Sequence, residues 1–326
     1  MRKKEVIYLS LILLFLFIGA IRNKNRVYTF SKTRIVFDTF VEVQVLSKDK
    51  DFERFIDTLF IKMDKWDSLY SYQNPHSSLS QINQNLTDKI DSTLCFLLTY
   101  SKQIYYDSDS MFDVTVGALT DIWDFEKEIV PTKEQIAQAK KNIGFEKIVF
   151  DRGRLTKPKE LKINLGAVAK GYIVDLGVEF LEQNGALSGF INAGGDIGLF
   201  GDHLQKIGIA HPREEGGIVK VVNLNNLSIV TSGDYERYFF ADGRRYHHIL
   251  NPKTGEPAEG LVSVSVIAKE TYIADALATA VFVMGIKKGI KYINSHQDVE
   301  AICFFETADG IGHIQSDGFE EFIADE

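Results

Sequence analysis

The stretch TYIADALATAVFVMG, residues 271–285, is an apolar run interrupted by Asp275 and Thr279. Its length and its closing glycine predict a helix that ends near Gly285. Asp275 and Thr279 are four residues apart, so a helix places both side chains on one face, with Cβ atoms roughly 5–6 Å apart. Removing a carboxylate from water without a partner costs several kcal/mol. We therefore expect Asp275 to face a group that compensates its charge.

Two interpretations of this pair are open from the residues alone. A carboxylate and a hydroxyl on one face suit a hard cation, and Mg²⁺ is the natural candidate because it combines a few protein oxygens with phosphate oxygens and water. In the other interpretation, the hydroxyl of Thr279 bonds back to its own helix and Asp275 pairs with a basic residue.

Charge is distributed unevenly between the two ends of the chain. Residues 1–26 hold six Lys and Arg residues and one Glu. The 326-residue chain carries −8 and residues 1–26 contribute +5, so residues 27–326 carry −13. An acidic body of this size argues against nucleic acid as the main partner.

Residues 1–26 have the pattern of a signal peptide or membrane anchor. Residues 6–21 form an uncharged segment of 16 residues between two basic clusters. That is slightly short for a spanning helix, which needs about 17–25 residues. No clear cleavage site follows, which favours an uncleaved anchor over a cleaved signal. A buried core helix is a third interpretation, and the flanking basic clusters argue against it.

The remaining residues, 27–326, are expected to form a single catalytic domain. Predicted strands and helices interleave without a regular βαβ rhythm, which favours an α+β fold with a mixed or antiparallel sheet and packed helices. Thr132 and Gln135 have the spacing of a capping box at a helix start. Three further expectations are one strand over 34–46, paired strands at 146–151 and 160–166, and a helix over 168–185.

A second group of candidate residues lies at the start of that last helix. A strand is expected to end at Asn164, and Gly166 allows a close approach of the backbone. The following helix offers free N–H groups and the positive end of its dipole. Lys170 sits in the first turn, where the dipole disfavours a cation. A nearby phosphate would explain this lysine, and a solvated surface position is the alternative.

Two further segments carry candidate polar residues. In INAGGDIGLFG, residues 191–201, paired glycines permit a close approach of the backbone. Asp196 in this segment either caps local backbone N–H groups or binds a ligand. In RRYHHILNPKTGEPA, residues 244–258, a histidine beside a bound phosphoanhydride would serve as a general base. Because alternate residues of a strand face opposite sides, only one of His247 and His248 is expected to face a site. A purely structural role for both is the alternative.

Six motifs in order resemble the ApbE family, the FAD:protein FMN transferases, over roughly residues 35–305. They are FDVTVGAL (112–119), NLGAVAKGY (164–172), INAGGDI (191–197), VTSGDYERY (230–238), HHILNPKTGEP (247–257) and ADALATAVFVMG (274–285). The resemblance implies an enzyme that binds FAD and Mg²⁺ and cleaves the pyrophosphate. FMN is then transferred to a threonine hydroxyl of a target protein through a phosphoester, and AMP is released.

The resemblance also implies roles for individual residues. Asp275 and Thr279 match the metal-binding carboxylate and hydroxyl, and Ala167 matches a backbone carbonyl ligand. His248 is the candidate base for the acceptor threonine. Seven residues match flavin-dinucleotide contacts: Phe37, Met111, Phe112, Asp113, Asn164, Lys170 and Leu250.

Three positions depart from the family pattern. Asn164 and Asn251 stand where Asp is usual, and Asp38 stands where glycine is expected. The first of these changes removes a negative charge near the metal. None of them touches the Asp275–Thr279 pair.

The sequence therefore predicts a Mg²⁺-dependent flavin transferase anchored in the inner (cytoplasmic) membrane, with its catalytic domain on the extracytoplasmic side. Expected acceptors are flavin-carrying subunits of membrane redox complexes, such as the sodium-pumping NADH:quinone reductase. One alternative is an FAD pyrophosphatase that uses water and yields FMN and AMP. A non-catalytic flavin-binding protein is another, and the presence of the metal-ligand residues argues against it.

Overall fold

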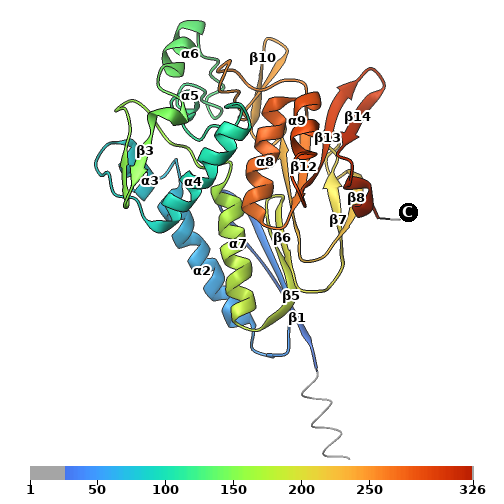
Figure 1. Ribbon diagram of the computed structural model, residues 1–326. Coiled ribbons are helices and arrows are strands. Elements are labelled where there is room, and N and C mark those ends of the chain that lie inside the picture. The colour runs from blue at the N-terminus through green and yellow to red at the C-terminus, as the bar shows by residue number, and fades with distance from the viewer. Residues whose placement is uncertain (1–25, 325–326) are drawn as a thin grey trace, which may run out of the picture.

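The computed structural model describes residues 26–324, and its central element is an eight-stranded antiparallel sheet with the order β1-β2-β5-β6-β9-β12-β13-β14 (Figure 1). All seven neighbouring pairs are antiparallel. This confirms the predicted α+β class. The strands are β1 (Tyr28–Val36), β2 (Thr39–Ser47), β5 (Ala186–Ala193), β6 (Asp196–Phe200), β9 (Ser228–Gly233), β12 (Ser263–Ala268), β13 (Glu300–Thr307) and β14 (Gly310–Gln315).

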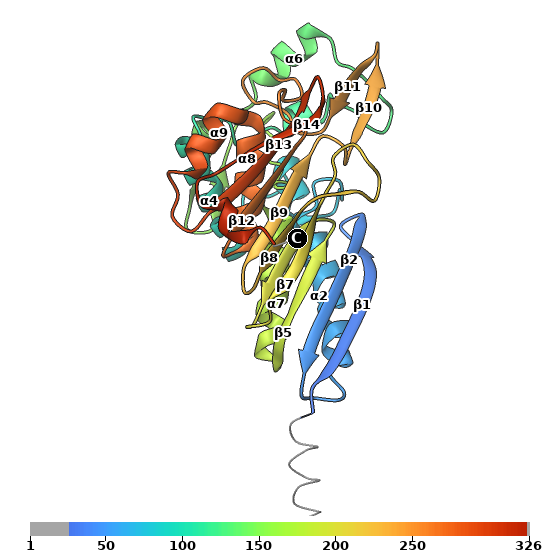
Figure 2. The same ribbon diagram turned by 90° about the vertical axis from the view of Figure 1, so that its right-hand side faces the viewer.

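The two faces of this sheet bury different clusters of apolar side chains. In β9, Val230 packs into the cluster beneath the helices, and its neighbour Ile229 packs into the cluster on the opposite face. Helices α2 (Glu53–Tyr70), α7 (Ala169–Gln183), α8 (Thr271–Met284) and α9 (Ile286–Ile293) contact the strands of the first face (Figures 1 and 2). The hairpin of β7 (Gln205–Ala210) and β8 (Ile218–Leu224), with the short helix η2 (Phe319–Phe322), packs in the cluster of the other face.

A smaller region of short helices and hairpins lies at one end of α7 and α8 (Figure 1). It contains α3 (Ser78–Asn83), α4 (Ser92–Asp107), α5 (Gly117–Thr120), α6 (Lys133–Lys140) and η1 (Phe145–Lys147). Its strands are β3 (Val149–Asp151), β4 (Arg154–Thr156), β10 (Tyr238–Ala241) and β11 (Arg244–His247). The predicted capping box of Thr132 and Gln135 is present at the start of α6.

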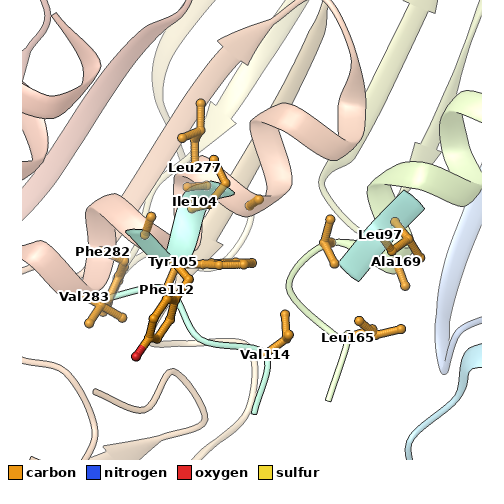
Figure 3. Close-up of a cluster of buried hydrophobic side chains, with 14 of the residues drawn as sticks. Leu97, Ile104, Tyr105, Phe112, Val114, Leu165, Ala169, Leu277, Phe282 and Val283 are labelled. Carbon is orange, nitrogen blue, oxygen red and sulfur yellow. The ribbon is translucent and has the colours of Figure 1, made fainter. Parts of the chain in front are cut away.

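Helix α8 is buried on nearly every side, as its apolar sequence predicts. Leu277, Phe282 and Val283 lie in one apolar cluster with Phe112 and with Ile104 and Tyr105 of α4 (Figure 3). The helix ends at Met284, and Gly285 follows with a φ of 74°. The predicted helix and its C-terminus are therefore confirmed.

The prediction of one strand over 34–46 was wrong, because the chain turns back at Phe37 and Asp38. Both residues have a φ of 57°, and Val36 pairs with Thr39 across this two-residue turn. Left-handed backbone at two successive positions makes a tight hairpin turn, usually with Asn or Gly. The alternation of apolar residues continues across the turn, so the pattern hides it.

The predicted pairing of 146–151 with 160–166 was also wrong. Strand β3 pairs with β4, joined by Arg152 and Gly153 at φ 47° and 74°. Because this turn is so tight, β3 pairs with the residues that follow it directly. Lys162 makes only an isolated parallel bridge to Val116.

The predicted signal or anchor lies outside the described residues, apart from Arg26. Within residues 26–324, no helix combines the length and apolar character needed to cross a bilayer.

Candidate functional site

The N-terminal turns of α7 and α8 meet at Gly171 and Asp275. The N–H of Gly171 donates to Oδ2 of Asp275 over 3.1 Å. A Cβ on Gly171 would lie 2.6 Å from the carbonyl oxygen of Thr271, so only glycine permits this approach of the two helices. Part of the compensation for the buried charge of Asp275, which is 5% exposed, is therefore a free N–H at the start of α7.

A second buried carboxylate, that of Asp196, lies near Asp275. Asp196 begins β6 directly after the Gly194–Gly195 turn. Its Oδ1 lies 3.0 Å from Nζ of Lys170. Its Oδ2 is buried and has no hydrogen-bond partner among residues 26–324. One oxygen of this carboxylate is thus paired and the other remains available to a ligand.

The electrostatics of this cluster favour an added positive charge. Burial raises the pKa of Asp275 well above its usual value, and repulsion from Asp196 raises it further. Burial also raises the pKa of Asp196, although Lys170 opposes that shift. The carboxylates of Asp275, Asp196 and nearby Glu236 outnumber the one lysine and leave an excess of negative charge in a largely buried site. Lys170 is therefore not a solvated surface residue, and its position in the first turn of α7 is explained by its ion pair with Asp196.

Thr279 lies one turn further along α8 than Asp275, and its hydroxyl faces the sheet. Its Oγ1 is 3.4 Å from Oγ of Ser232 in β9. Ala167 lies in the turn that precedes α7. Helix α8 and strands β6 and β9 thus contribute carboxylate and hydroxyl oxygens to this region.

These oxygens fit a hard divalent cation of the Mg²⁺ type. In the described part of the chain, no group of three or more His, Cys, Asp or Glu side chains is arranged to hold a metal ion. A cation here would rely on the carboxylates of Asp275 and Asp196, supplemented by hydroxyl, carbonyl and external oxygens. Mg²⁺ is bound in this way, through one or two carboxylates plus substrate phosphates and water.

His247 and His248 have different surroundings. Nε2 of His247 lies 2.8 Å from the carbonyl oxygen of Ala258, and its Nδ1 accepts from the N–H of Ile249 over 3.3 Å. The ring also packs against Phe282 at a centroid distance of 5.5 Å. His247 is 5% exposed and satisfied by its neighbours, which is a structural role.

His248 follows β11 directly, and its ring is not satisfied in this way. Its backbone N–H donates to the carbonyl oxygen of Arg237, while Nδ1 is buried without a partner among the described residues. Burial lowers the pKa of His248 to about 3, and the positive charges of Arg237 and Lys170 contribute to the shift.

Several predicted flavin contacts have local structural partners. Oδ1 of Asp113 accepts from the backbone N–H and the hydroxyl of Thr115, over 2.8 and 2.7 Å. Burial raises the pKa of Asp113 to about 6. Phe112 lies inside the core next to α8 (Figure 3). Met111 is partly buried and packs against the same core.

Phe37 and Leu250 lie in other apolar clusters. Phe37 packs against the cluster between α2 and the β1–β2 hairpin, and Leu250 belongs to a cluster with Trp123. The β1–β2 hairpin nevertheless touches the glycine turn before Asp196. The N–H of Gly194 donates to the carbonyl oxygen of Phe40 over 3.2 Å.

The two asparagines that depart from the family pattern each stabilise a turn. Oδ1 of Asn164 accepts from the N–H of Gly166 over 2.9 Å, and its amide donates to Oγ1 of Thr120 over 3.3 Å. Oδ1 of Asn251 accepts from the N–H of Lys253 over 2.8 Å. An aspartate could accept both backbone bonds equally well, but only asparagine can donate to Thr120.

Sequence reasoning left Asp196 undecided and missed Gly171 and Ser232. Glycine is unfavourable in a helix interior, so Gly171 in the first turns of α7 is a detectable sign of close packing. Ser232 gives no such sign, because a serine in a strand is ordinary.

Together, the fold and the site define an α+β protein with an eight-stranded antiparallel sheet and a carboxylate-lined site where the N-terminal turns of α7 and α8 meet. A family model described as "ApbE family" matches residues 37–303, and the chain belongs to this family. The FAD:protein FMN transferase of Treponema pallidum is 30% identical over 317 residues, which cover 88% of each chain. That of Vibrio cholerae is 29% identical over 299 residues, which cover 87% of this chain and 88% of the relative.

Solved structures agree with this assignment. The ApbE protein of Thermotoga maritima superposes with a TM-score of 0.84 at 30% identity, covering 91% of this chain and 100% of the other. The flavin transferase ApbE of Vibrio cholerae superposes with a TM-score of 0.81 at 26% identity, with the same coverage.

Proposed function

We propose that the protein is a Mg²⁺-dependent FAD:protein FMN transferase. The observation that carries the proposal is the pair of buried carboxylates of Asp275 and Asp196. Oδ2 of Asp196 has no hydrogen-bond partner among residues 26–324. Such a pair is costly unless a cation joins it. Relatives named FAD:protein FMN transferase, matched over most of their length, support the choice of substrate.

The residues that would hold the cation are Asp275, Thr279 and the carbonyl of Ala167, with Oδ2 of Asp196 beside them. Bound there, Mg²⁺ would offset the charge of the pyrophosphate and orient it for in-line attack. Lys170, held by its ion pair with Asp196, would supply a further positive charge for the phosphates. The positive end of the α7 dipole favours the same anionic part of FAD.

His248 is the residue proposed to take the proton of the acceptor hydroxyl. In the transfer, the bond from the threonine oxygen to the FMN phosphorus forms as the bond from that phosphorus to AMP breaks. The hydroxyl proton passes to the imidazole. With a pKa lowered to about 3, the ring is neutral at physiological pH and available as an acceptor. It is a weak base, so accurate placement of the hydroxyl has to supply much of the rate.

The proposed acceptor is a threonine in a flavin-carrying subunit of a membrane redox complex, and the proposed location is the extracytoplasmic side of the inner membrane. The support is the basic–apolar–basic pattern of residues 1–26. Tyr28 and the Phe37 turn are at opposite ends of β1, which spans roughly 30 Å for its nine residues. An anchor before Tyr28 would thus leave the Phe37 end of the sheet free. Cell fractionation tests this, since full-length protein found in the cytosol would refute it.

The transferase activity is tested by incubating the purified protein with FAD, Mg²⁺ and a candidate acceptor, followed by mass spectrometry of the acceptor. A mass increase equal to FMN minus water on a threonine is the expected result. Release of free FMN and AMP with an unmodified acceptor would indicate the FAD pyrophosphatase instead. Recovery of intact FAD with every acceptor tried would indicate flavin binding without turnover.

A further inference from the structure

Helix α8, which carries two of the proposed metal ligands, has no N-terminal cap of its own. Its N-cap residue, Glu270, makes no side-chain capping bond. The cap comes instead from Asp175 on α7. Oδ1 of Asp175 accepts from the N–H of Thr271 over 2.8 Å, and Oδ2 accepts from the N–H of Tyr272 over 2.9 Å. One carboxylate therefore satisfies two of the free N–H groups at the start of α8.

The start of α7 is capped by α8 in the same manner. The N-cap residue of α7, Val168, makes no side-chain capping bond, and the N–H of Gly171 donates to Asp275. Asp175 lies one turn after Gly171, and Asp275 lies one turn after Thr271. The two helices are thus locked at two points, from Gly171 to Asp275 and from Asp175 to Thr271. Sliding or rotating one helix against the other breaks both.

This lock fixes the distance between the two halves of the candidate site. Asp275 and Thr279 belong to α8, Lys170 belongs to the first turn of α7, and Ala167 lies in the turn just before it. Asp175 itself faces a different cavity, of about 300 Å³, lined by Glu179, Glu182 and Glu270 among others. It therefore acts on the site through the helices and not by contact with FAD.

We propose that Asp175 is a positioning residue that sets the affinity of this site for Mg²⁺ by holding α8 against α7. The proposal rests on the assignment of Asp275 and Thr279 as metal ligands in the proposed function. Groups that orient metal ligands typically change metal affinity or activity by about 10–100-fold when removed. We expect a change of that order for Asp175→Ala.

The matched control is Glu179→Ala. Glu179 is a carboxylate on the same helix, one turn beyond Asp175, and its Oε1 accepts only from the side chain of Gln183 among the described residues. The substitution Glu179→Ala therefore removes one negative charge from α7, as Asp175→Ala does, but it breaks no bond to α8.

The test measures Mg²⁺ binding directly by calorimetry, with and without FAD, and the Mg²⁺ concentration that gives half-maximal FMN transfer. For Asp175→Ala we expect the dissociation constant for Mg²⁺ and the half-maximal Mg²⁺ concentration each to rise by about tenfold or more. Excess Mg²⁺ should restore most of the transfer rate. Glu179→Ala should match the wild type. Asp175→Asn, which keeps one acceptor oxygen, should lie between.

Unchanged Mg²⁺ binding in folded Asp175→Ala would overturn the proposal, even if the variant melts at a lower temperature. If Asp175→Ala does not fold, Asp175→Asn is judged by the same criterion. Equal shifts in Asp175→Ala and Glu179→Ala would also overturn it, because a general charge effect would then explain both. A wild type that binds Mg²⁺ but transfers no FMN would refute the proposed function and leave the binding comparison valid.

Discussion

Nζ of Lys170 lies 3.0 Å from Oδ1 of Asp196, while Oδ2 of the same carboxylate is buried without a partner in the described part of the chain. The first turn of α7 is an unfavourable place for a cation because of the helix dipole. The ion pair offsets that cost and holds the lysine at the site. The ion pair thus explains why both side chains are buried here. Oδ2 of Asp196 and the remaining donors of the Lys170 ammonium group are still able to bind a ligand.

Changing Asp275 to Ala should abolish Mg²⁺-dependent FMN transfer and leave a folded protein. The change removes a buried charge, which favours stability, and also removes the cap of Gly171, which costs about 1 kcal/mol. We expect the free energy of unfolding to change by no more than about that amount. Asp275→Asn should keep the bond to Gly171 and still lose transfer. Transfer is measured by mass spectrometry of the acceptor. Full transfer by either variant at the Mg²⁺ concentration used for the wild type would contradict the role of Asp275 as a metal ligand.

Changing Lys170 to Met should destabilise the protein, because it leaves the 1%-exposed carboxylate of Asp196 unpaired. Breaking a buried pair in this way typically costs about 3–5 kcal/mol. The double variant Lys170→Met with Asp196→Asn should recover much of that loss, since no buried charge is left. Urea unfolding of the wild type, the two single variants and the double variant gives the interaction free energy between Lys170 and Asp196. Additive effects would show that the two side chains do not interact.

The sequence predicted α8 correctly because everything needed is local. The apolar run, the i, i+4 spacing of Asp275 and Thr279, and the closing Gly285 all lie within one segment. The meeting of Lys170 with Asp196 could not be predicted, because it depends on the sheet order that brings the start of β6 under α7. The reciprocal caps of α7 and α8 are non-local for the same reason, since Asp175 and Thr271 are 96 residues apart.

The turn at Phe37 shows a different limit. Its first residue is a phenylalanine, which is unusual in left-handed backbone, so Asp38 is the only turn residue that marks it. The alternating pattern of the two strands also continues through the turn.

Changing His248 to Ala should lower FMN transfer by about 10²–10⁴-fold, the usual loss for a general base, with FAD affinity little changed. His247→Ala is the matched control. It should reduce transfer far less and act mainly on stability, because His247 bonds to Ala258 and packs on Phe282. Equal transfer rates for the wild type and His248→Ala would place the base elsewhere. Loss of FAD binding in His248→Ala would instead make the residue a flavin contact.

The pKa of His248 also predicts the pH profile. An unperturbed imidazole with a pKa near ~6.5 would lose its capacity as a base between pH 7 and 5. With a pKa lowered to about 3, His248 stays neutral over that range. Protonation of His248 should therefore not lower kcat/KM for transfer at any pH above 5. Any decrease of kcat/KM toward acid pH in that range should persist in His248→Ala. A limb near pH 6.5 that disappears in the variant would show that the ring is more solvated than its surroundings indicate.

The last prediction concerns Asp113, whose pKa is raised by burial to about 6 from a usual 3.8. The folded protein therefore holds this proton more tightly than the unfolded chain does. The resulting stabilisation is fully present below about pH 3.8 and is lost as the pH rises through about 6. The shift corresponds to at most ~3 kcal/mol between those limits.

Asp113→Asn keeps an oxygen that accepts both bonds from Thr115 but cannot titrate. The free energy of unfolding of Asp113→Asn relative to the wild type should therefore increase from pH 4 to pH 7.5. The control is Asp124→Asn. Hydrogen bonding to Lys127 lowers the pKa of Asp124 below its usual 3.8, so its difference from the wild type should change little between pH 4 and pH 7.5. Denaturant unfolding of the three proteins at both pH values measures these differences. A pH-independent difference for Asp113→Asn would mean that the carboxyl is ionised as readily in the folded protein as in the unfolded chain.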